Sequence, residues 1–176
     1  LKSMAKNILI IYSSIDGHTI SICKHISKSL EESHFPKLMN LENIKKSDIE
    51  EAEKILIGAS IRYGDHSKEL YNFIEIHKEL IEHKENAFFS VNAVARKPEK
   101  NKPETNPYIN KFLKRTGWKP NKIAVFAGRI DYPKYNFFDK HMIRLIMWIT
   151  NGPTDLNKTY EFTNWNDVDE FAKKIL

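Results

Sequence analysis

The first apolar run of the chain ends in a hydroxyl-rich turn, and a helical pattern begins directly after that turn. The run spans residues 8–12, and the turn reads Ser13-Ser14-Ile15-Asp16-Gly17-His18-Thr19. A turn of this kind aims several backbone N–H groups at one point, and the positive end of the helix dipole reinforces them. The junction therefore predicts an α/β fold with an anion site, most simply a phosphate site, at the end of its first strand.

The residues of this turn narrow the kind of phosphate that it can hold. Residues 13–19 contain no lysine or arginine, whereas a P-loop for nucleoside triphosphates ends in Gly-Lys-Ser or Gly-Lys-Thr. The spaced glycines of a dinucleotide-binding turn are also missing. A neutral, hydroxyl-rich cradle suits a single terminal phosphate, such as that of flavin mononucleotide (FMN).

Strand-like and helical patterns alternate along the rest of the chain. Strands are predicted at residues 7–12, 37–41, 54–59, 86–91 and 122–127, helices are predicted to begin near residues 18, 66 and 107, and a last helix is predicted at 165–175. Such alternation predicts a doubly wound parallel sheet with helices on both faces. Because ligands bind at the carboxyl ends of such strands, we expect the site in the loops at residues 13–19, 60–64 and 92–96 and in the stretch after residue 127.

The length of the chain predicts one domain. With 176 residues, the chain can form one sizeable core but not two ordinary domains. We expect the domain to cover residues 4–176, with an insert at residues 128–158 that is too long for a simple strand-to-helix connection. Residues 1–3 are set apart as an expression remnant or an upstream extension. No signal peptide is expected, and no apolar run approaches the about 20 residues of a membrane span.

The chain is basic, and its charge is uneven. The formal net charge is +5, and lysines and arginines gather between residues 96 and 122. Such a segment can contact phosphates, anionic lipid or an acidic small molecule, or it can be a solvated loop. No nucleic-acid-binding motif accompanies it, so we do not expect a nucleic-acid partner. The one cysteine, Cys23, is expected to be buried in a helix, and the histidines show no metal-ligand spacing.

Two further loops carry residues suited to a flat ring system. In the loop at residues 60–64, Ser60 and backbone groups can bond to a ring edge, while Tyr63 can stack on the ring face. Arg62 can stabilise negative charge on a reduced flavin, or it can be a surface arginine paired with a carboxylate. The small residues after Asn92 can let a ligand approach the backbone closely, or they can simply pack.

The insert carries a strongly apolar helical pattern at residues 137–150. Its apolar side chains form one broad face, made by Phe138, Met142, Leu145 and Ile149 and widened by Ile143, Ile146, Met147 and Trp148. Such a surface can be buried on the domain, can lie at a membrane surface, or can wall a pocket for an apolar substrate. Residues 159–162 are predicted to resume the sheet as an edge strand before the last helix.

Four motifs together resemble one known family. They are Ser13-Ser14-x-Asp16-Gly17-x-Thr19, Ile57-Gly58-Ala59-Ser60-Ile61-Arg62-Tyr63-Gly64, Phe89-Ser90-Val91-Asn92-x-Val94-Ala95-Arg96-Lys97-Pro98-Glu99-Lys100, and Tyr132-Pro133-x-Tyr135 with Asp139 and Met142-Ile143-x-Leu145-Ile146-Met147. With these motifs the chain resembles, over nearly its whole length, the quinone-dependent protoporphyrinogen IX oxidases of flavodoxin fold. The resemblance implies an α/β, flavodoxin-like sheet of five parallel strands in the order 2-1-3-4-5, with the long insert at strand 5.

The resemblance also implies an activity and a location. Such a protein is an FMN-dependent oxidoreductase of haem and porphyrin biosynthesis that oxidises protoporphyrinogen IX to protoporphyrin IX. Its electrons pass to a quinone, either menaquinone or ubiquinone. The family is cytoplasmic and in peripheral contact with the inner face of the cell membrane, which implies a link to the respiratory chain.

The resemblance further implies which residues bind the cofactor. They are Ser14, Ile15, Asp16, Gly17, His18, Thr19, Ser60, Arg62, Tyr63, Gly64, Phe88, Ser90, Val91, Asn92, Val94, Ala95 and Arg96. Since a carboxylate would repel a phosphate, we predict that Asp16 turns away and caps the following helix. His18 is predicted to be an early helix residue rather than an acid or base.

The substrate of such an enzyme is an apolar macrocycle with propionate groups, and the insert offers both matching kinds of side chain. The substrate-binding candidates are Arg129, Tyr132, Lys134, Lys140 and Arg144. An apolar wall is expected from Phe137, Phe138, Met142 and Trp148. The catalytic base is not identified, and His141 and Tyr135 are candidates by location only.

Two other functions are compatible with the same fold. An electron-carrying flavodoxin would share the fold and FMN, but we would expect it to present an acidic docking face, which the pI of about 9.1 argues against. An NAD(P)H:quinone reductase would keep the quinone chemistry but would need a nicotinamide site, for which the sequence shows no distinct motif.

Overall fold

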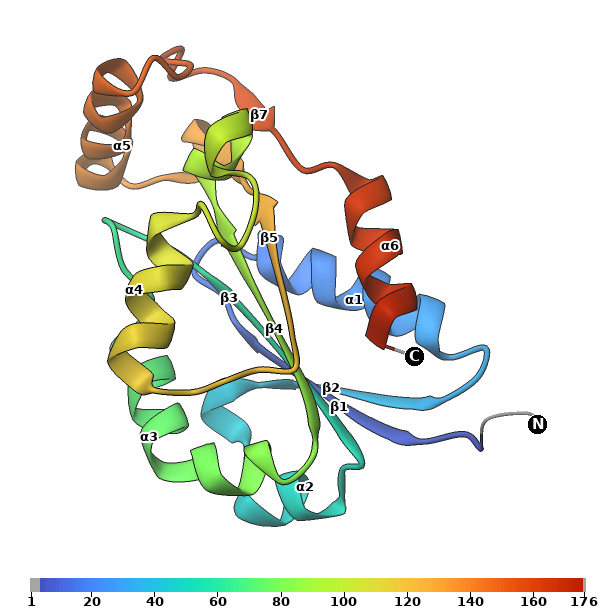
Figure 1. The fold of residues 1–176 in the computed structure, drawn as a ribbon. Helices are drawn as coiled ribbons and strands as arrows, with labels where there is room; N and C mark the ends of the chain where they lie inside the picture. Colours follow the sequence, from blue (N-terminus) through green and yellow to red (C-terminus); the bar gives the residue numbers. More distant parts are fainter. Residues whose placement is uncertain (1–3, 176) are drawn as a thin grey trace.

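A parallel sheet of five strands forms the centre of the molecule in the computed structural model, which describes residues 4–175 (Figure 1). The strands are β1 (Asn7–Ser13), β2 (Phe35–Asn40), β3 (Lys54–Ser60), β4 (Glu85–Asn92) and β5 (Lys122–Ala127). They lie in the order β2-β1-β3-β4-β5, and each neighbouring pair is parallel. The predicted sheet and its strand order are confirmed. The status of residues 1–3 and the end of the domain at residue 176 lie outside the described residues.

Helices cover both faces of this sheet, as predicted (Figure 1). On one face lie α2 (Lys46–Glu51), α3 (Lys68–Glu82) and α4 (Pro107–Thr116), and on the other lie α1 (His18–Leu30) and α6 (Trp165–Ile175). The sequence did not predict α2, because six residues are too few to show a helical period. No helix within residues 4–175 is long and apolar enough to cross a membrane.

An apolar core on each face explains why the strands form. In β1, Leu9 and Ile11 pack into the core that contains α3 and α4, whereas Ile8 and Ile10 pack into the core that contains α1 and α6. Strands covered on both faces need apolar residues at consecutive positions, which is the pattern at residues 8–11. Cys23 of α1 belongs to the second core, as predicted, and burial raises the pKa of its thiol.

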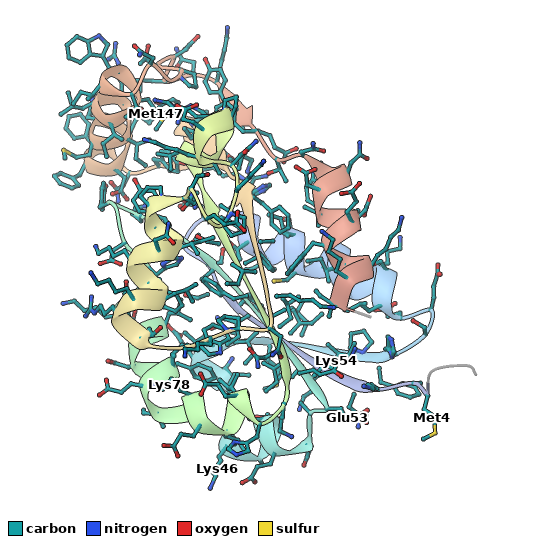
Figure 2. The ribbon with its side chains drawn as sticks, viewed as in Figure 1. Met4, Lys46, Glu53, Lys54, Lys78 and Met147 are labelled. Atoms are coloured by element: carbon teal, nitrogen blue, oxygen red, sulfur yellow. The ribbon has the colours of Figure 1, made fainter. Side chains whose placement is uncertain are left out.

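The insert forms a small unit of its own beyond the carboxyl end of the sheet (Figure 1). It contains β6 (Arg129–Asp131), α5 (Phe137–Ile149) and, past the predicted end of the insert at residue 158, β7 (Thr159–Glu161). Its buried centre consists of Ile130, Tyr132 and Met147. Figure 2 shows Met147 at this end of the molecule, while Glu53 and Lys54 lie toward the opposite end.

The prediction that residues 159–162 resume the main sheet is wrong. Residues 159–161 pair in antiparallel fashion with β6, so that Asp131 lies opposite Thr159 and Arg129 opposite Glu161. Only Gly128 separates β6 from the end of β5, and its carbonyl oxygen accepts the N–H of Phe162 at 3.0 Å. The returning chain therefore meets the backbone of β6 rather than the edge of the main sheet.

Candidate functional site

A pocket opens at the carboxyl ends of the strands, and both the loops of the sheet and the insert line it. The predicted site residues that line it are Ser14, Asp16, His18, Thr19, Ser60, Arg62, Tyr63, Gly64, Val91, Asn92, Val94 and Arg129. Residues that were not predicted as site residues also line it, among them Ile61, Ala93, Tyr108 and Gly128. The fold thus brings the three predicted loops and the insert to one place.

The turn after β1 is shaped by a glycine and a serine. Gly17 precedes the first turn of α1 with φ of 83°, a left-handed conformation that favours glycine. Its N–H donates to Ser14 Oγ at 3.0 Å. The first N–H groups of any helix lack intrahelical partners, so the start of α1 offers donors to an anion at this turn.

Asp16 does not cap α1, so that prediction is wrong. The residue before the helix is Gly17, and no side chain among residues 4–175 caps the helix. The carboxylate of Asp16 instead forms an ion pair with the guanidinium of Arg62. The charge of Arg62 offsets that of Asp16, which reduces the repulsion that this carboxylate would exert on a phosphate bound at the turn.

The loop after β3 is a tight hairpin. Arg62 and Asp65 exchange backbone hydrogen bonds of 3.1 and 3.4 Å, and between them Tyr63 and Gly64 have φ values of 52° and 81°. Two consecutive positive φ values define a type I′ turn, which is unusual for a tyrosine. The turn holds the half-exposed ring of Tyr63 at the edge of the pocket.

Arg62 is the charged centre of the pocket. Besides Asp16, its guanidinium donates to Asp139 at 3.1 Å, and it lies 5.3 Å from the centre of the Tyr135 ring. Burial lowers the pKa of Arg62, but Asp16 and Asp139 outweigh burial, and the pKa lies above its ordinary value. Of the two interpretations of this arginine, pairing with carboxylates is observed, although the pairs lie in the pocket rather than on the open surface.

A buried network of hydrogen bonds around Asn92 holds the loop that follows β4. Asn92 Oδ1 accepts the N–H of Ala95 and an amide hydrogen of Asn106, both at 3.1 Å, and Asn92 Nδ2 donates to Ser90 Oγ at 3.2 Å. His66 Nε2 lies 3.0 Å from the same Ser90 oxygen. Burial lowers the pKa of His66 to about 4, so its ring is neutral in the folded protein near neutral pH.

Several predicted cofactor residues do not line the pocket. Phe88 is buried and stacks on Phe112, with ring centres 4.9 Å apart. Ser90 and Ala95 are buried, and Arg96 donates to the backbone oxygens of Ala93 and Thr150. Ile15 and Gly17 belong to the phosphate turn without lining the pocket. Their direct contact with the cofactor therefore stays a prediction.

The substrate candidates of the insert mostly lie apart from the pocket. Arg129 lines it. Lys134 is exposed and pairs with Asp131 at 3.3 Å, and Lys140 and Arg144 lie on α5 without lining the pocket. Tyr132 is fully buried and donates to the carbonyl oxygen of Pro153 at 2.7 Å, so its hydroxyl is committed to the insert and the prediction that it binds substrate is wrong.

The apolar face of α5 is divided between pocket and surface. Ile143, Ile146 and Met147 line the pocket. The expected wall residues Phe137, Phe138 and Trp148 point the other way, with exposed fractions of 81, 65 and 71%. The sequence pattern showed how broad the apolar face is, but only packing against Ile130 and Tyr132 selected its inner edge.

His18 is held as a structural group at the start of α1. It is buried, and its Nε2 lies 2.6 Å from Thr163 Oγ1. Burial and, second, the charge of Arg129 lower its pKa, so the ring is neutral near neutral pH. Its position agrees with the prediction of an early helix residue. Tyr135 lines the pocket, whereas His141 does not.

The residues of the pocket fit FMN. Thr19 Oγ1 and Ser60 Oγ are buried hydroxyls that have no hydrogen-bond partner among the described residues, and both residues line the pocket. Buried polar groups are normally bonded, so these two hydroxyls fit a polar ligand. The start of α1 suits its phosphate, and Tyr63 suits a flat ring. Within residues 4–175, no group of His, Cys, Asp or Glu side chains is arranged to hold a metal ion.

Comparison with known proteins establishes the class of protein. The family model described as a flavodoxin domain matches residues 9–157. Flavodoxin 1 from Bacillus cereus has a TM-score of 0.52 to this structure, with 96% of each chain covered and 13% sequence identity. The sheet, the turn after β1 and the family match thus define a flavodoxin-like protein, and FMN is borne out as the cofactor of this class.

Sequence relatives establish the family within this class. A protein of Escherichia coli strain K12 with the name protoporphyrinogen IX dehydrogenase (quinone) is 39% identical over 168 residues, which are 95% of this chain and 93% of the relative. A protein of Leishmania major with the same name is 38% identical over 174 residues, covering 98% of this chain and 75% of the relative. The chain belongs to the protoporphyrinogen IX dehydrogenase (quinone) family of flavodoxin-domain proteins, as the sequence motifs predicted.

Proposed function

We propose that this protein oxidises protoporphyrinogen IX to protoporphyrin IX with FMN as cofactor and a quinone, menaquinone or ubiquinone, as electron acceptor. The observation that carries this proposal is the shared pocket: Ile143 and Met147 of the insert line the same pocket as Thr19 of the phosphate turn. An electron carrier needs only the cofactor loops, whereas an enzyme also needs a surface that receives its substrate. The names of the family relatives support this substrate and acceptor.

Each part of the pocket has a role in this proposal. When bound, FMN supplies the redox chemistry, while the protein supplies binding, orientation and electrostatics. The start of α1 and Thr19 hold the phosphate. Ile143, Ile146 and Met147 give an apolar wall that suits a macrocycle and keeps water away from it. Arg129, at the edge of this wall, offers a positive charge to a propionate group.

The cofactor site is tested first by removing one unpartnered hydroxyl. Thr19→Val keeps the shape of a buried side chain and removes an oxygen that has no partner within the described residues. A hydrogen bond to a charged group contributes about 1.5–3 kcal/mol, so we expect FMN affinity to fall by about tenfold to a hundredfold. Ser29→Ala is the matched control, since Ser29 is an exposed residue near the other end of the same helix and its hydroxyl donates to the carbonyl oxygen of Ile26. Equal FMN affinity in wild type and Thr19→Val would contradict this assignment of the site.

The reaction is tested with purified, FMN-loaded protein under exclusion of oxygen. The protein is mixed with a quinone and either protoporphyrinogen IX or NAD(P)H, and quinone reduction is followed by absorbance. We expect reduction with protoporphyrinogen only. Reduction with NAD(P)H alone would favour an NAD(P)H:quinone reductase, and absence of turnover with both donors would favour an electron carrier.

We also propose that the protein is cytoplasmic and contacts the cell membrane peripherally through the outer face of α5. Leu145, Trp148 and Ile149 on this face are 47, 71 and 65% exposed, and Lys140 and Arg144 lie on the same helix. Aromatic, aliphatic and cationic side chains on one helix suit the surface of an anionic bilayer. A quinone acceptor resides in the bilayer, which fits this placement and the proposed link to the respiratory chain.

Membrane contact is tested by sedimentation with vesicles that contain anionic lipid. Ile149→Ser removes an exposed apolar residue from the outer face of α5, and Ile76→Ser makes the same change at a residue of α3 that is 74% exposed. We expect the first variant to bind vesicles several-fold more weakly than wild type and the second to bind as wild type does. Equal binding by both variants would show that α5 is not the contact.

A further inference from the structure

Asp139 joins the insert to the two loops that are predicted to hold the cofactor. It lies in the first turn of α5, and its carboxylate accepts from Arg62 at 3.1 Å and from the hydroxyl of Tyr63. Arg62 reaches on to Asp16 in the turn after β1. One chain of contacts therefore runs from the phosphate turn through the hairpin to the insert helix.

The ion pair between Arg62 and Asp139 is mostly buried, unlike a surface ion pair. The side chains of Arg62 and Asp139 are 14 and 20% exposed, so solvent screens them less than an exposed pair. Burial and then the bond to Asp139 raise the pKa of Tyr63 to about 12, so the hydroxyl that donates to Asp139 stays protonated well above neutral pH. Asp139 has a second set of partners in its own helix, because Asn136 caps α5 and donates to it at 3.0 Å.

The rest of the insert is held to the sheet by few buried side chains. Its centre contains Ile130, Tyr132 and Met147, whereas each face of the sheet has a far larger core. The two apolar side chains in the first turn of α5, Phe137 and Phe138, are exposed and add no buried contact. The contact between Asp139 and Arg62 is therefore important for the position of α5 over the pocket.

We propose that Asp139 is a positioning residue that couples the cofactor loops to the substrate wall, so that seating of FMN against the hairpin of Arg62 and Tyr63 orders α5 over the pocket. The wall residues Ile143, Ile146 and Met147 follow Asp139 on the same helix. A ligand that fixes the hairpin reduces the number of conformations open to Asp139, and by linkage the ordered helix favours the ligand equally. This inference rests on the FMN site of the proposed function.

The coupling is measured by hydrogen exchange of the α5 amides in the full chain, with and without FMN. In wild type we expect FMN to slow exchange in the first turns of α5 by about fivefold or more, the lower end of common coupling energies. In Asp139→Asn, which keeps the local partner Asn136 but loses the charge that binds Arg62, we expect this protection to disappear. Asp155→Asn is the matched control, because Asp155 is an exposed carboxylate of the insert that pairs with Lys158 at 3.5 Å and does not line the pocket.

A second variant breaks the contact between Arg62 and Asp139 by changing the arginine. Arg62→Gln leaves α5 unchanged in sequence. With FMN at concentrations that saturate the variant, we expect it to abolish the FMN-dependent protection of α5 even if Asp139→Asn fails to fold. The double variant should show no further loss of protection, because both changes break the contact between Arg62 and Asp139. Asp139→Glu, which restores the charge, should recover part of the protection and lower the KM for protoporphyrinogen relative to Asp139→Asn.

The outcomes separate this inference from the function on which it rests. If wild type binds no FMN, the proposed cofactor site fails. If wild type binds FMN but α5 exchanges at the same rate with and without it, or if Asp139→Asn keeps full protection, the proposed coupling is overturned while the cofactor site stands.

Discussion

The sheet and the insert of this protein are built in different ways. The strands of the sheet are covered on both faces, and their side chains belong to two large apolar cores. The insert has three buried apolar residues at its centre, and five of the large apolar side chains of α5 are exposed. Polar contacts therefore carry much of the attachment of the insert, among them Arg62 to Asp139 and Arg96 to Thr150.

We infer from this difference that the sheet provides most of the stability and the insert most of the substrate specificity. The loops that are predicted to hold FMN are anchored on the rigid ends of β1, β3 and β4, so the cofactor site inherits the stability of the sheet. The insert adds the apolar wall of the pocket but little buried area. We therefore expect changes in the sheet to act on the free energy of unfolding and changes in the insert to act on local order and on substrate binding.

The largest expected change in the free energy of unfolding comes from removing a buried aromatic side chain from a core of the sheet. Phe112 of α4 is fully buried and contacts the rings of His66, Phe88 and Trp118. Phe112→Ala should lower the free energy of unfolding by about 3–5 kcal/mol. Phe138→Ala is the control in the insert, since Phe138 is 65% exposed, and it should change this free energy by about 0.5 kcal/mol or less. Denaturant titrations of both variants measure the difference, and similar losses would contradict the comparison.

The next largest effect is a loss of stability in acid through His66. Burial lowers the pKa of His66 to about 4 in the folded protein, while an unfolded histidine titrates near pH about 6.5. Between these values the unfolded chain binds a proton that the folded protein does not, so stability falls as pH falls from 6.5 toward 4. The linkage amounts to about 3 kcal/mol for this group, and His18, whose pKa burial also lowers, acts in the same direction.

His66→Asn tests this assignment through the pH dependence of the free energy of unfolding rather than through its absolute value. The variant loses ring contacts with Phe88 and Phe112 and is expected to be less stable at every pH. Its free energy of unfolding should nevertheless fall less steeply between pH 6.5 and pH 4 than that of wild type. Parallel curves for the two proteins would show that His66 does not cause the acid sensitivity.

The smallest effect is expected from a single hydroxyl in the insert. Tyr132→Phe removes the donor to the carbonyl oxygen of Pro153, a contact of 2.7 Å. The loss should be about 1 kcal/mol, and it should speed amide exchange within residues 130–160 without changing exchange in β1 or β3. Faster exchange in those strands as well would mean that insert and sheet unfold as one unit, which would break the comparison.

The elements of the sheet could be predicted from the sequence because they follow from short-range patterns. Consecutive apolar residues in β1 and β3 match strands that are buried on both faces, and the helix starts at His18 and Pro107 agree with the predicted positions. The phosphate turn was also visible, since Ser14, Gly17 and Thr19 carry its chemistry within a few residues. Family motifs then identified the family and, with it, the class of cofactor.

The partners across the pocket could not be predicted in the same way. Asp16 was expected to cap α1, but Arg62, 46 residues further along the chain, binds it, and Asp139 joins the same arginine from 77 residues away. Residues 159–161 formed a strand as expected, yet they paired with β6 rather than with the main sheet. A sequence pattern shows which side chains can form ion pairs or strands, but not which partners the fold brings within reach.

By itself the sequence determined the sheet and the family and predicted a phosphate site in the turn after β1, because apolar periodicity and local turn chemistry act over a few residues. Only the tertiary structure decided that Ile143, Ile146 and Met147 face the pocket while Trp148 and Ile149 face outward. Helix α5 is apolar around most of its circumference, so the sequence pattern did not predict which side faces the pocket. Packing against Ile130 and Tyr132, together with the contact of Asp139 with Arg62, fixed that side.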